Sequence, residues 1–520
     1  MYSKVLVIGL DGATFDLLSP WIKRGKLPTI AKIIQNGVHG NLKSIIPIST
    51  GPAWSSIITG KYPTNHGIFG FMTRREGSYE LTPVNSTFRR SKDLWEIISE
   101  NGRKVGVVNV PFTYPPRKVN GFMISGLMTP RRSRDFTYPP SLREELKGYK
   151  MHVNEVWREG DEEIYINDLT ETMESVAKTS IRLMRSRDWD FFMTVFWTTD
   201  QVQHAFWSYM DKNHPAYTLE KNRKYGGIIL KHYERIDEHI AEMVNIIDEN
   251  TTIFIVSDHG AGPLHRWIHL NSLLRSLGLL KFKNTPLTRI KVNLFDHGWT
   301  PLNFYKLLVK IHLGKIRETF GRGGGRFHWL MGGPFLSFSD IDWRSTKAYS
   351  IPGFGQIFLN VRDREPEGIV SQGGEYEEIR EEIISKFNKL RDPLTGEKVF
   401  EKVSKIEQLY PSSQHRVNHS PDILLLPKRT YATFPDYEIG SNSIIGPVFG
   451  TSGTHSINGI IIMKGQAVKK GKTLDNADLV DVAPTVLYLM GIPIPEDIDG
   501  RVLTEAIDPS YLENNPVKYS

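Results

Sequence analysis

The chain has 520 residues, roughly three to four times a common domain, so we expect one large domain with an insertion or two domains. Its composition, 39% hydrophobic and 24% charged, is globular and excludes a wholly disordered chain. With no cysteine in the sequence, disulfides, thiolate metal sites and cysteine nucleophiles are excluded. A net charge of +7 is mild for this length and does not by itself indicate nucleic-acid binding, so no specific nucleic-acid partner is expected.

Apolar runs alternate with helical patterns through the first half of the chain. Buried strands are predicted over 5–10, 104–110, 191–197 and 251–257, and helices over 15–35, 93–100, 168–187 and 221–249. This alternation predicts an α/β fold, a mostly parallel sheet with helices on both faces. A strand over 459–463 and a helix over 481–489 resume the pattern near the end.

The stretch 263–447 interrupts this alternation. It has predicted strands of its own over 357–361 and 422–426 and a helix over 375–390. We interpret it as an inserted α+β cap, with 1–262 and 448–520 forming the catalytic core. A separate C-terminal domain is the alternative.

No apolar run reaches the ~18 residues that a membrane span requires, so no transmembrane segment is expected. The first residues are typical of a buried strand rather than a signal peptide, and we expect a cytoplasmic protein.

Six side chains of metal-binding type lie at the ends of predicted strands or in the loops beside them: Asp11, Asp200, His204, Asp258, His259 and His455. Carboxyl ends of parallel strands meet at one edge of a sheet, so these side chains are expected to lie close together. Asp200 and His204 are four residues apart, which places both on one face if that segment is helical. Three carboxylates and three imidazoles suit two divalent ions, zinc first, with manganese or iron as alternatives.

A hydroxyl stands at the start of a further predicted helix. Thr50 occupies an N-cap position, Pro52 follows in the first turn, and the helix runs to about Thr59. The free N–H groups of a helix N-terminus favour a phosphate beside that hydroxyl. The simpler interpretation is that Thr50 only caps the helix.

Together these residues resemble the alkaline phosphatase superfamily, and most closely its type I phosphodiesterase/nucleotide pyrophosphatase branch with the prokaryotic phosphohydrolase and phosphomutase relatives. The resemblance rests on LVIGLDG at 6–12, the Thr50 loop with ITGKYPTNHGI at 58–68, Asp200 with His204, SDHG at 257–260, GTH at 453–455 and DVAPT at 481–485. These motifs cover most of the predicted core and are specific for the superfamily, but not for a substrate.

The resemblance implies how the six side chains divide. Asp200, His204 and His455 would hold one divalent ion. Asp11, Asp258 and His259 would hold a second, which also contacts the Thr50 oxygen. Thr50 would then be the nucleophile of a two-metal phosphohydrolase that forms a phospho-threonine intermediate.

The chain departs from the branch beside the nucleophile. An asparagine usually follows the His-Gly-Ile stretch, but here Phe69-Gly70-Phe71 stands in that place, and no arginine adjoins Thr50. We expect the Gly51 N–H to bind the phosphoryl group instead, with His265 or Arg266 as alternative donors.

Several functions share this chemistry. The leading hypothesis is hydrolysis of a phosphodiester or phosphomonoester on a small molecule, lipid or glycan. A phosphomutase and a non-catalytic metal- or phosphate-binding protein are the alternatives. A sulfatase is disfavoured, because its modified Cys or Ser with a following arginine is missing around Thr50.

A basic stretch within the predicted cap has helical apolar spacing. Over 306–326 six basic residues stand against Glu318, namely Lys306, Lys310, Lys315, Arg317, Arg322 and Arg326. We favour a solvated helix packed on the cap, and weak association with an anionic surface is the alternative.

Overall fold

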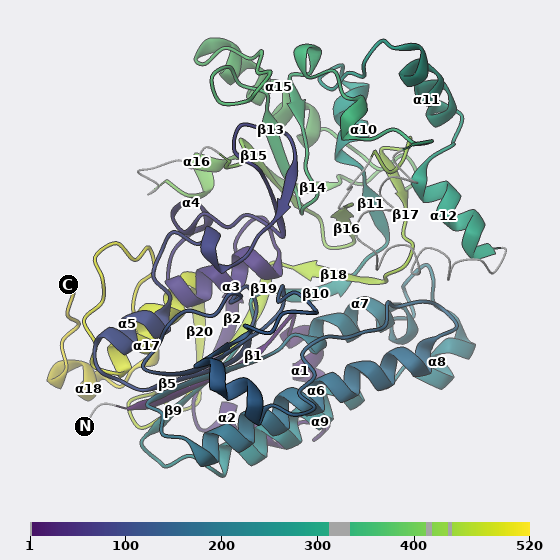
Figure 1. The fold of residues 1–520 in the computed structure, drawn as a ribbon. Coiled ribbons are helices and arrows are strands. Elements are labelled where there is room, and N and C mark those ends of the chain that lie inside the picture. The colour runs from purple at the N-terminus through teal and green to yellow at the C-terminus, as the bar shows by residue number, and fades with distance from the viewer. Residues whose placement is uncertain (1–2, 311–332, 412–418, 435–438) are drawn as a thin grey trace.

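The computed structural model describes residues 3–310, 333–411, 419–434 and 439–520 (Figure 1). Its largest element is a nine-stranded sheet in the order β20-β2-β19-β9-β1-β8-β5-β6-β7. The strands are β1 (Lys4–Leu10), β2 (Val38–Lys43), β5 (Val105–Val110), β6 (Gly121–Ser125), β7 (Thr137–Tyr138), β8 (Phe191–Phe196), β9 (Thr251–Val256), β19 (Asn458–Lys464) and β20 (Lys472–Asp478). Within this sheet β19 and β7 run opposite to the other strands, which confirms the predicted mostly parallel α/β class.

Helices cover both faces of this sheet (Figure 1). One face carries α1 (Phe15–Lys23), α2 (Pro28–Gln35), α6 (Glu162–Ser186), α7 (Thr198–Met210) and α9 (Ile228–Val244). The other face carries α3 (Thr50–Thr59), α5 (Leu94–Glu100) and α17 (Val482–Leu489). Val5 and Val7 of β1 pack into the second layer, whereas Leu6 and Ile8 pack into the first. Because successive side chains of a strand face opposite ways, a strand covered on both sides is apolar throughout.

Three predicted helices differ from those observed. α6 begins at Glu162, so Asp168 lies inside the helix and accepts hydrogen bonds from the Asn154 and Glu155 N–H groups rather than capping it. The helix predicted over 221–249 is two helices, α8 (Leu219–Tyr225) and α9, separated by Gly226 and Gly227. The helix predicted over 15–35 is likewise α1 followed by α2, which restarts at Pro28, where a fixed φ suits a first turn.

Residues 263–447 build a layer of their own above one edge of the large sheet (Figure 1). Its four-stranded sheet is β12 (Ala348–Tyr349), β13 (Gln356–Leu359), β15 (Ile423–Pro427) and β14 (Phe400–Lys405), and its three-stranded sheet is β16 (Tyr431–Thr433), β11 (Arg266–Ile268) and β17 (Ile445–Pro447). The helices are α10 (Leu270–Ser276), α11 (Pro286–Asp296), α12 (Pro301–Lys310), α15 (Gly374–Asn388) and α16 (Ile406–Leu409). A separate cluster of buried apolar side chains joins most of these elements.

This layer has the α+β character expected of the cap, although the domain division itself stays an interpretation. The basic residues Lys315, Arg317, Arg322 and Arg326 lie outside the described residues. Among the helices that the structure describes, none combines the length and the apolar character that a membrane span needs.

Smaller elements complete the fold. They are α4 (Pro63–His66), α18 (Pro509–Asn514) and the hairpin β3 (Met72–Arg74) with β4 (Leu81–Pro83). A second two-stranded sheet, β10 (Gly260–Pro263) with β18 (Gly453–Ser456), connects the two ends of the core, and it pairs Ala261 with His455. β18 also packs against α7.

A small residue is required where β18 meets α7. A Cβ atom on Gly453 would stand 2.5 Å from the Gln203 carbonyl oxygen, which is backbone and cannot rotate away. We predict that Gly453→Ala lowers the free energy of unfolding by about 1–3 kcal/mol, the usual cost of overpacking. Urea denaturation measures this loss. Gly227→Ala is the control, since a Cβ there meets nothing within 4 Å, and equal stability of Gly453→Ala and wild type would contradict the prediction.

Candidate active site

The structure brings the six predicted ligands together as two groups. Asp200, His204 and His455 form the first, here the Asp200 group, and Asp11, Asp258 and His259 form the second, here the Asp11 group. Within each group, one potential ligand atom from each residue lies within 4.8 Å of the others. The division is the one that the family resemblance implies.

Strand pairing explains why distant residues converge. β1 pairs with β9 in parallel, with Gly9 opposite Val256, so Asp11 and Asp258 follow at matching positions. Asp200 and His204 lie one turn apart on α7, as their spacing predicts for a helix. His455 belongs to β18 and not to a loop, which corrects the sequence-based expectation; pairing with β10 brings it to His259. The rings of His259 and His455 are stacked with centroids 3.9 Å apart.

Ligand atoms in the Asp200 group have the spacing that one ion needs. The Nε2 atoms of His204 and His455 are 3.1 Å apart. They lie 3.2 and 3.6 Å from the Asp200 Oδ1 atom. Tetrahedral ligands at the zinc–nitrogen distance of about 2.0–2.1 Å are about 3.4 Å from one another. The donor set therefore fits one divalent ion.

Two carboxylate oxygens of the Asp11 group are buried and accept no hydrogen bond from the described residues: Asp11 Oδ1 and Asp258 Oδ2. The His259 Nε2 atom lies 3.6 and 3.3 Å from them. Their partner oxygens are held, because Trp54 Nε1 donates to Asp11 Oδ2 over 3.0 Å and the Gly12 N–H donates to Asp258 Oδ1 over 3.3 Å. Buried oxygens are costly without a partner, so the group fits a second cation.

Backbone carbonyls orient all three imidazoles. The Nδ1 atoms of His204, His259 and His455 lie 2.7, 3.0 and 3.1 Å from the carbonyl oxygens of Gly453, Gly260 and Ile48, respectively. A carbonyl only accepts, so each Nδ1 carries a proton and each ring turns its Nε2 toward its group. This is the arrangement by which outer contacts fix metal-binding histidines.

Three buried carboxyl groups, those of Asp11, Asp200 and Asp258, lie close enough at the centre of the site to repel one another. Burial, followed by repulsion from Asp258 and Asp200, raises the pKa of Asp11 well above its usual value. Burial and Asp200 raise the pKa of Asp258 in the same way. Burial also disfavours ionised Asp200, but the attraction of this carboxylate to His204 is stronger and lowers the pKa of Asp200. The same attraction raises the pKa of His204 to about 9, although burial alone would lower it. Bound cations would relieve the repulsion among these carboxylates.

Thr50 lies beside the Asp11 group. Its Oγ1 atom is 3.5 Å from His259 Nε2, and the residue is only 4% exposed. It is the first residue of α3, so Ser49 and not Thr50 is the N-cap, and the Ser49 side chain makes no capping hydrogen bond. The first N–H groups of a helix have no partner inside the helix, so those of Thr50 and Gly51 are available to an anion.

Phe71 is one of the residues that stand, in sequence, where the phosphodiesterase branch usually has an asparagine. The Phe71 ring contacts the edge of Phe112 at a centroid distance of 5.1 Å. Phe112 packs so closely on Gly51 that a Cβ there would stand 2.4 Å from its ring. Any larger residue at position 51 would therefore clash with Phe112.

The alternative donors His265 and Arg266 are positioned differently. Arg266 Nε lies 3.4 Å from Asp392 Oδ2, and its Nη2 donates to the Ile445 carbonyl, so its contacts tie it to the cap. Arg266 belongs to β11 of the three-stranded sheet, and its part as a phosphoryl donor stays a prediction. The His265 ring packs against His214 at 5.1 Å and lines a cavity.

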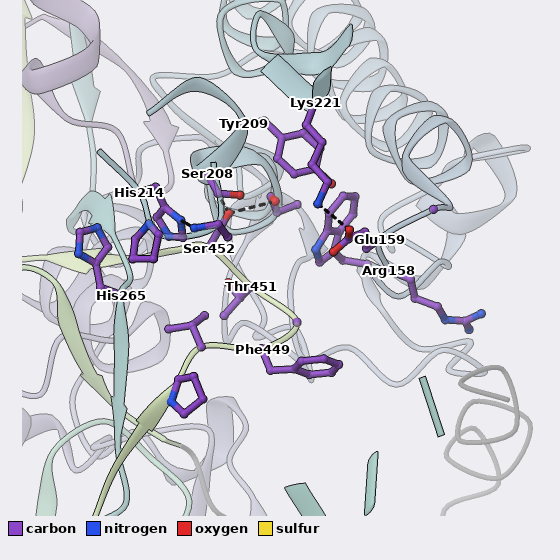
Figure 2. Close-up of a pocket in the computed structure, with 18 of the residues that line it drawn as sticks. Arg158, Glu159, Ser208, Tyr209, His214, Lys221, His265, Phe449, Thr451 and Ser452 are labelled. Carbon is purple, nitrogen blue, oxygen red and sulfur yellow. Dashed lines mark hydrogen bonds and ion pairs between the residues drawn. The ribbon is translucent and has the colours of Figure 1, made fainter. Parts of the chain in front are cut away.

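This cavity has a volume of about 480 Å³ and adjoins the Asp200 group. Figure 2 shows His214 and His265 on one side and Tyr209, Lys221 and Glu159 on the other. Thr451 joins it to the metal ligands, since its Oγ1 donates to the His204 carbonyl over 3.0 Å. Other lining residues include Trp157, Ser208, Phe449 and Ser452. No cavity was predicted here, although His265 was a candidate donor and Thr451 and Ser452 stand next to the GTH motif.

Known proteins show the family to which the chain belongs. The family model for type I phosphodiesterase/nucleotide pyrophosphatase matches residues 5–456. The chain belongs to this family. Human ectonucleotide pyrophosphatase/phosphodiesterase family member 1 is 22% identical over 303 residues, which cover 55% of this chain and 27% of that protein. The rat protein of the same name is 19% identical, and the match covers 61% of this chain and 30% of that protein. The chain thus spans less than a third of these relatives.

Solved structures share the whole fold at low identity. Phosphonoacetate hydrolase from Sinorhizobium meliloti, with phosphonoformate, has a TM-score of 0.56 and 16% identity, covering 94% of this chain and 96% of that one. Human ectonucleotide pyrophosphatase/phosphodiesterase 5 has a TM-score of 0.53 and 12% identity, and the match covers 98% of this chain and 99% of that one. An inactive Thr-to-Ala variant of the murine protein, in complex with AMP, has a TM-score of 0.53 and 12% identity, covering 94% and 95%.

The two groups generate a prediction about metal content. After loading with Zn²⁺ and gel filtration, the wild-type chain should carry two ions by elemental analysis. His204→Ala and Asp258→Ala should each lose about one, because each removes one of three ligands of a different group. His297→Ala, which changes an exposed histidine outside both groups, should retain two. One ion or none in wild type would refute the two-ion reading.

Proposed function

We propose that this chain is a two-metal phosphoric ester hydrolase that uses Thr50 as its nucleophile. The observation that carries the proposal is the position of Thr50, whose Oγ1 lies 3.5 Å from His259 Nε2 at the N-terminus of α3. A hydroxyl and a helix N-terminus then lie beside the Asp11 group, and the stacked rings of His259 and His455 link that group to the Asp200 group. Each group supplies three ligands and leaves coordination positions open, as catalytic sites require.

In the proposed reaction the Thr50 oxygen attacks phosphorus and the bond to the ester oxygen breaks. The departing alcohol takes up a proton, and the phosphoryl group stays on Thr50. Water then attacks the same phosphorus, breaks the bond to Thr50 and restores its hydroxyl. A phosphomonoester releases phosphate in this step, whereas a phosphodiester releases a monoester.

The chain's own residues bind and orient the reacting group. The N–H groups of Thr50 and Gly51 donate to phosphoryl oxygens, and the helix dipole favours their negative charge. Asp200, His204 and His455 would hold one ion and Asp11, Asp258 and His259 the other. Two divalent cations held there, zinc on this donor set, would lower the pKa of the Thr50 hydroxyl and neutralise charge on the entering and leaving oxygens.

The cavity beside His204 is the proposed site for the organic part of the substrate. Its aromatic side chains, Trp157, Tyr209 and Phe449, suit a planar or apolar group, and Ser208 and Thr451 add hydroxyls. A volume of about 480 Å³ suits a small molecule. A phosphorylated small molecule is therefore the proposed substrate, and a lipid or glycan headgroup of similar size fits the same space.

A substrate panel tests the function as a whole. Purified chain with Zn²⁺ or Mn²⁺ is assayed on bis-p-nitrophenyl phosphate, p-nitrophenyl phosphate, nucleotide pyrophosphates, phosphosugars and glycerophosphodiesters. Phosphonoacetate is included because a hydrolase of that compound shares the fold. We expect metal-dependent hydrolysis of at least one ester class. Turnover of none of these compounds would overturn the proposal.

Removing the nucleophile gives a sharper prediction. Thr50→Ala should lower kcat on the order of a thousandfold or more while both ions and the fold remain, since alanine cannot form the covalent intermediate. Thr50→Ser keeps a hydroxyl and should keep measurable turnover. Acid quench and intact mass spectrometry should detect a phosphoryl adduct in wild type and none in Thr50→Ala. A near-wild-type kcat for Thr50→Ala would point to direct attack by water.

Filling the cavity should change substrate choice and not chemistry. Ala216 is exposed and lines the cavity, so Ala216→Trp should reduce kcat/KM about tenfold or more for a phosphate ester with a large aromatic group. A small alkyl phosphate should be hydrolysed as by wild type. Ala216→Ser is the matched control. Equal losses on both substrates would show that the cavity does not hold the organic group.

A further inference from the structure

The outer helix of the cap exposes an apolar stripe. Leu287, Ile290 and Leu294 of α11 are spaced by three and four residues, so they share one face of the helix. They are 62, 59 and 42% exposed. The adjacent face, with Thr288, Lys291 and Phe295, is buried. α11 therefore packs one face on the cap and leaves a neighbouring apolar stripe exposed.

The stripe continues onto the next helix. The Trp299 N–H donates to the Leu294 carbonyl over 2.9 Å, and Trp299 is 41% exposed. Leu307 of α12 is 50% exposed. We call Leu287, Ile290, Leu294, Trp299 and Leu307 the outer stripe; they are half of the large apolar side chains that stand exposed among the described residues. Figure 1 shows α11 and α12 at the outer edge of the cap. Exposed apolar residues gathered in this way mark an interaction surface.

The chain segment that carries the outer stripe is rich in basic residues. The stretch 281–310 contains one acid, Asp296, against six basic residues: Lys281, Lys283, Arg289, Lys291, Lys306 and Lys310. Asp296 is already paired with Arg275, and Lys291 with Asp340. Lys281, Lys283 and Arg289 are exposed, and no carboxylate of the described residues forms an ion pair with them. The surface therefore presents apolar side chains and unneutralised cations together.

We propose that the outer stripe docks on an anionic lipid surface. Leucine and isoleucine would enter the boundary between headgroups and acyl chains, where tryptophan also partitions favourably. The neighbouring lysine and arginine side chains would contact acidic headgroups. A purely apolar protein groove would explain the stripe but not the excess of cations around it. The proposal concerns a surface of the cap and does not depend on the proposed hydrolase activity.

Vesicle co-sedimentation of the full chain tests this inference. Wild type should sediment with vesicles of phosphatidylcholine mixed with phosphatidylserine and stay in solution with phosphatidylcholine alone. Raised salt should weaken binding, because exposed charges are screened beyond about 10 Å at ~0.1 M. Leu287→Ser with Ile290→Ser should weaken binding about tenfold or more, since two buried leucine-sized groups are lost from the interface. Lys281→Glu, Lys283→Glu and Arg289→Glu together should abolish it.

Matched controls separate docking from general surface effects. Leu219→Ser and Ile164→Ser change side chains that are each 56% exposed on α8 and α6, and both should bind like wild type. All the substituted residues are exposed, so circular dichroism should show unchanged folding. Absence of binding to anionic vesicles, or equal binding by the Leu287/Ile290 variant, would overturn the proposal. Self-association that this variant abolishes, without lipid binding, would instead assign the stripe to a second copy of the chain.

Discussion

Parallel pairing of β1 with β9 sets Asp11 beside Asp258, and the electrostatic consequence governs the site around them. Burial and repulsion from Asp200 raise the pKa of both carboxyls, and Asp258 raises that of Asp11 further, so neither is stable as an anion without nearby positive charge. Trp54 and the Gly12 N–H satisfy one oxygen of each carboxylate. The remaining oxygens face His259, and a cation at this point completes the arrangement. The buried carboxyl pair therefore favours a bound cation even without substrate.

Close backbone approach lets the second group form within reach of the first. Gly12 has a φ of +69°, and a Cβ there would stand 3.1 Å from the Asp200 Oδ1 atom. Gly453 allows β18 to approach α7 in a similar way, and its carbonyl orients His204. Small residues at these two turns are as necessary to the geometry as the ligands, because a larger side chain would separate the two groups.

The sequence predicted the parts of the site that are encoded locally. Asp11, Asp258 and His259 directly follow apolar strands, and Asp200 with His204 has helical spacing, so strand topology and helix periodicity were enough to bring them together. The same reasoning predicted the wrong start for α6. Asp168 has the residue type of an N-cap, but it lies inside the helix and accepts a hydrogen bond from the loop before it. This reasoning also could not foresee the partner of Arg266, Asp392, which is more than a hundred residues away in the chain. Pairings of that kind leave no local pattern.

The residues that would select a substrate could not be predicted from the sequence for the same reason. The cavity beside His204 takes its lining from the loop around Trp157, from α7 and α8, from His265 and from the segment before β18. Such a surface exists only once the fold has formed, and none of these residues has a spacing that indicates a ligand.

The surroundings of Thr50 bear on the proposed mechanism. Phe112 packs on Gly51 and Phe71 packs on Phe112. Aromatic rings do not supply the hydrogen bond of an amide, so in the proposed mechanism binding of the phosphoryl oxygens would depend on the N–H groups of Thr50 and Gly51 and on bound metal ions. We therefore expect substrate affinity to depend more strongly on bound metal here than in a site that keeps the amide. Packing that excludes water around Thr50 partly compensates, because charge interactions strengthen where the dielectric constant is low.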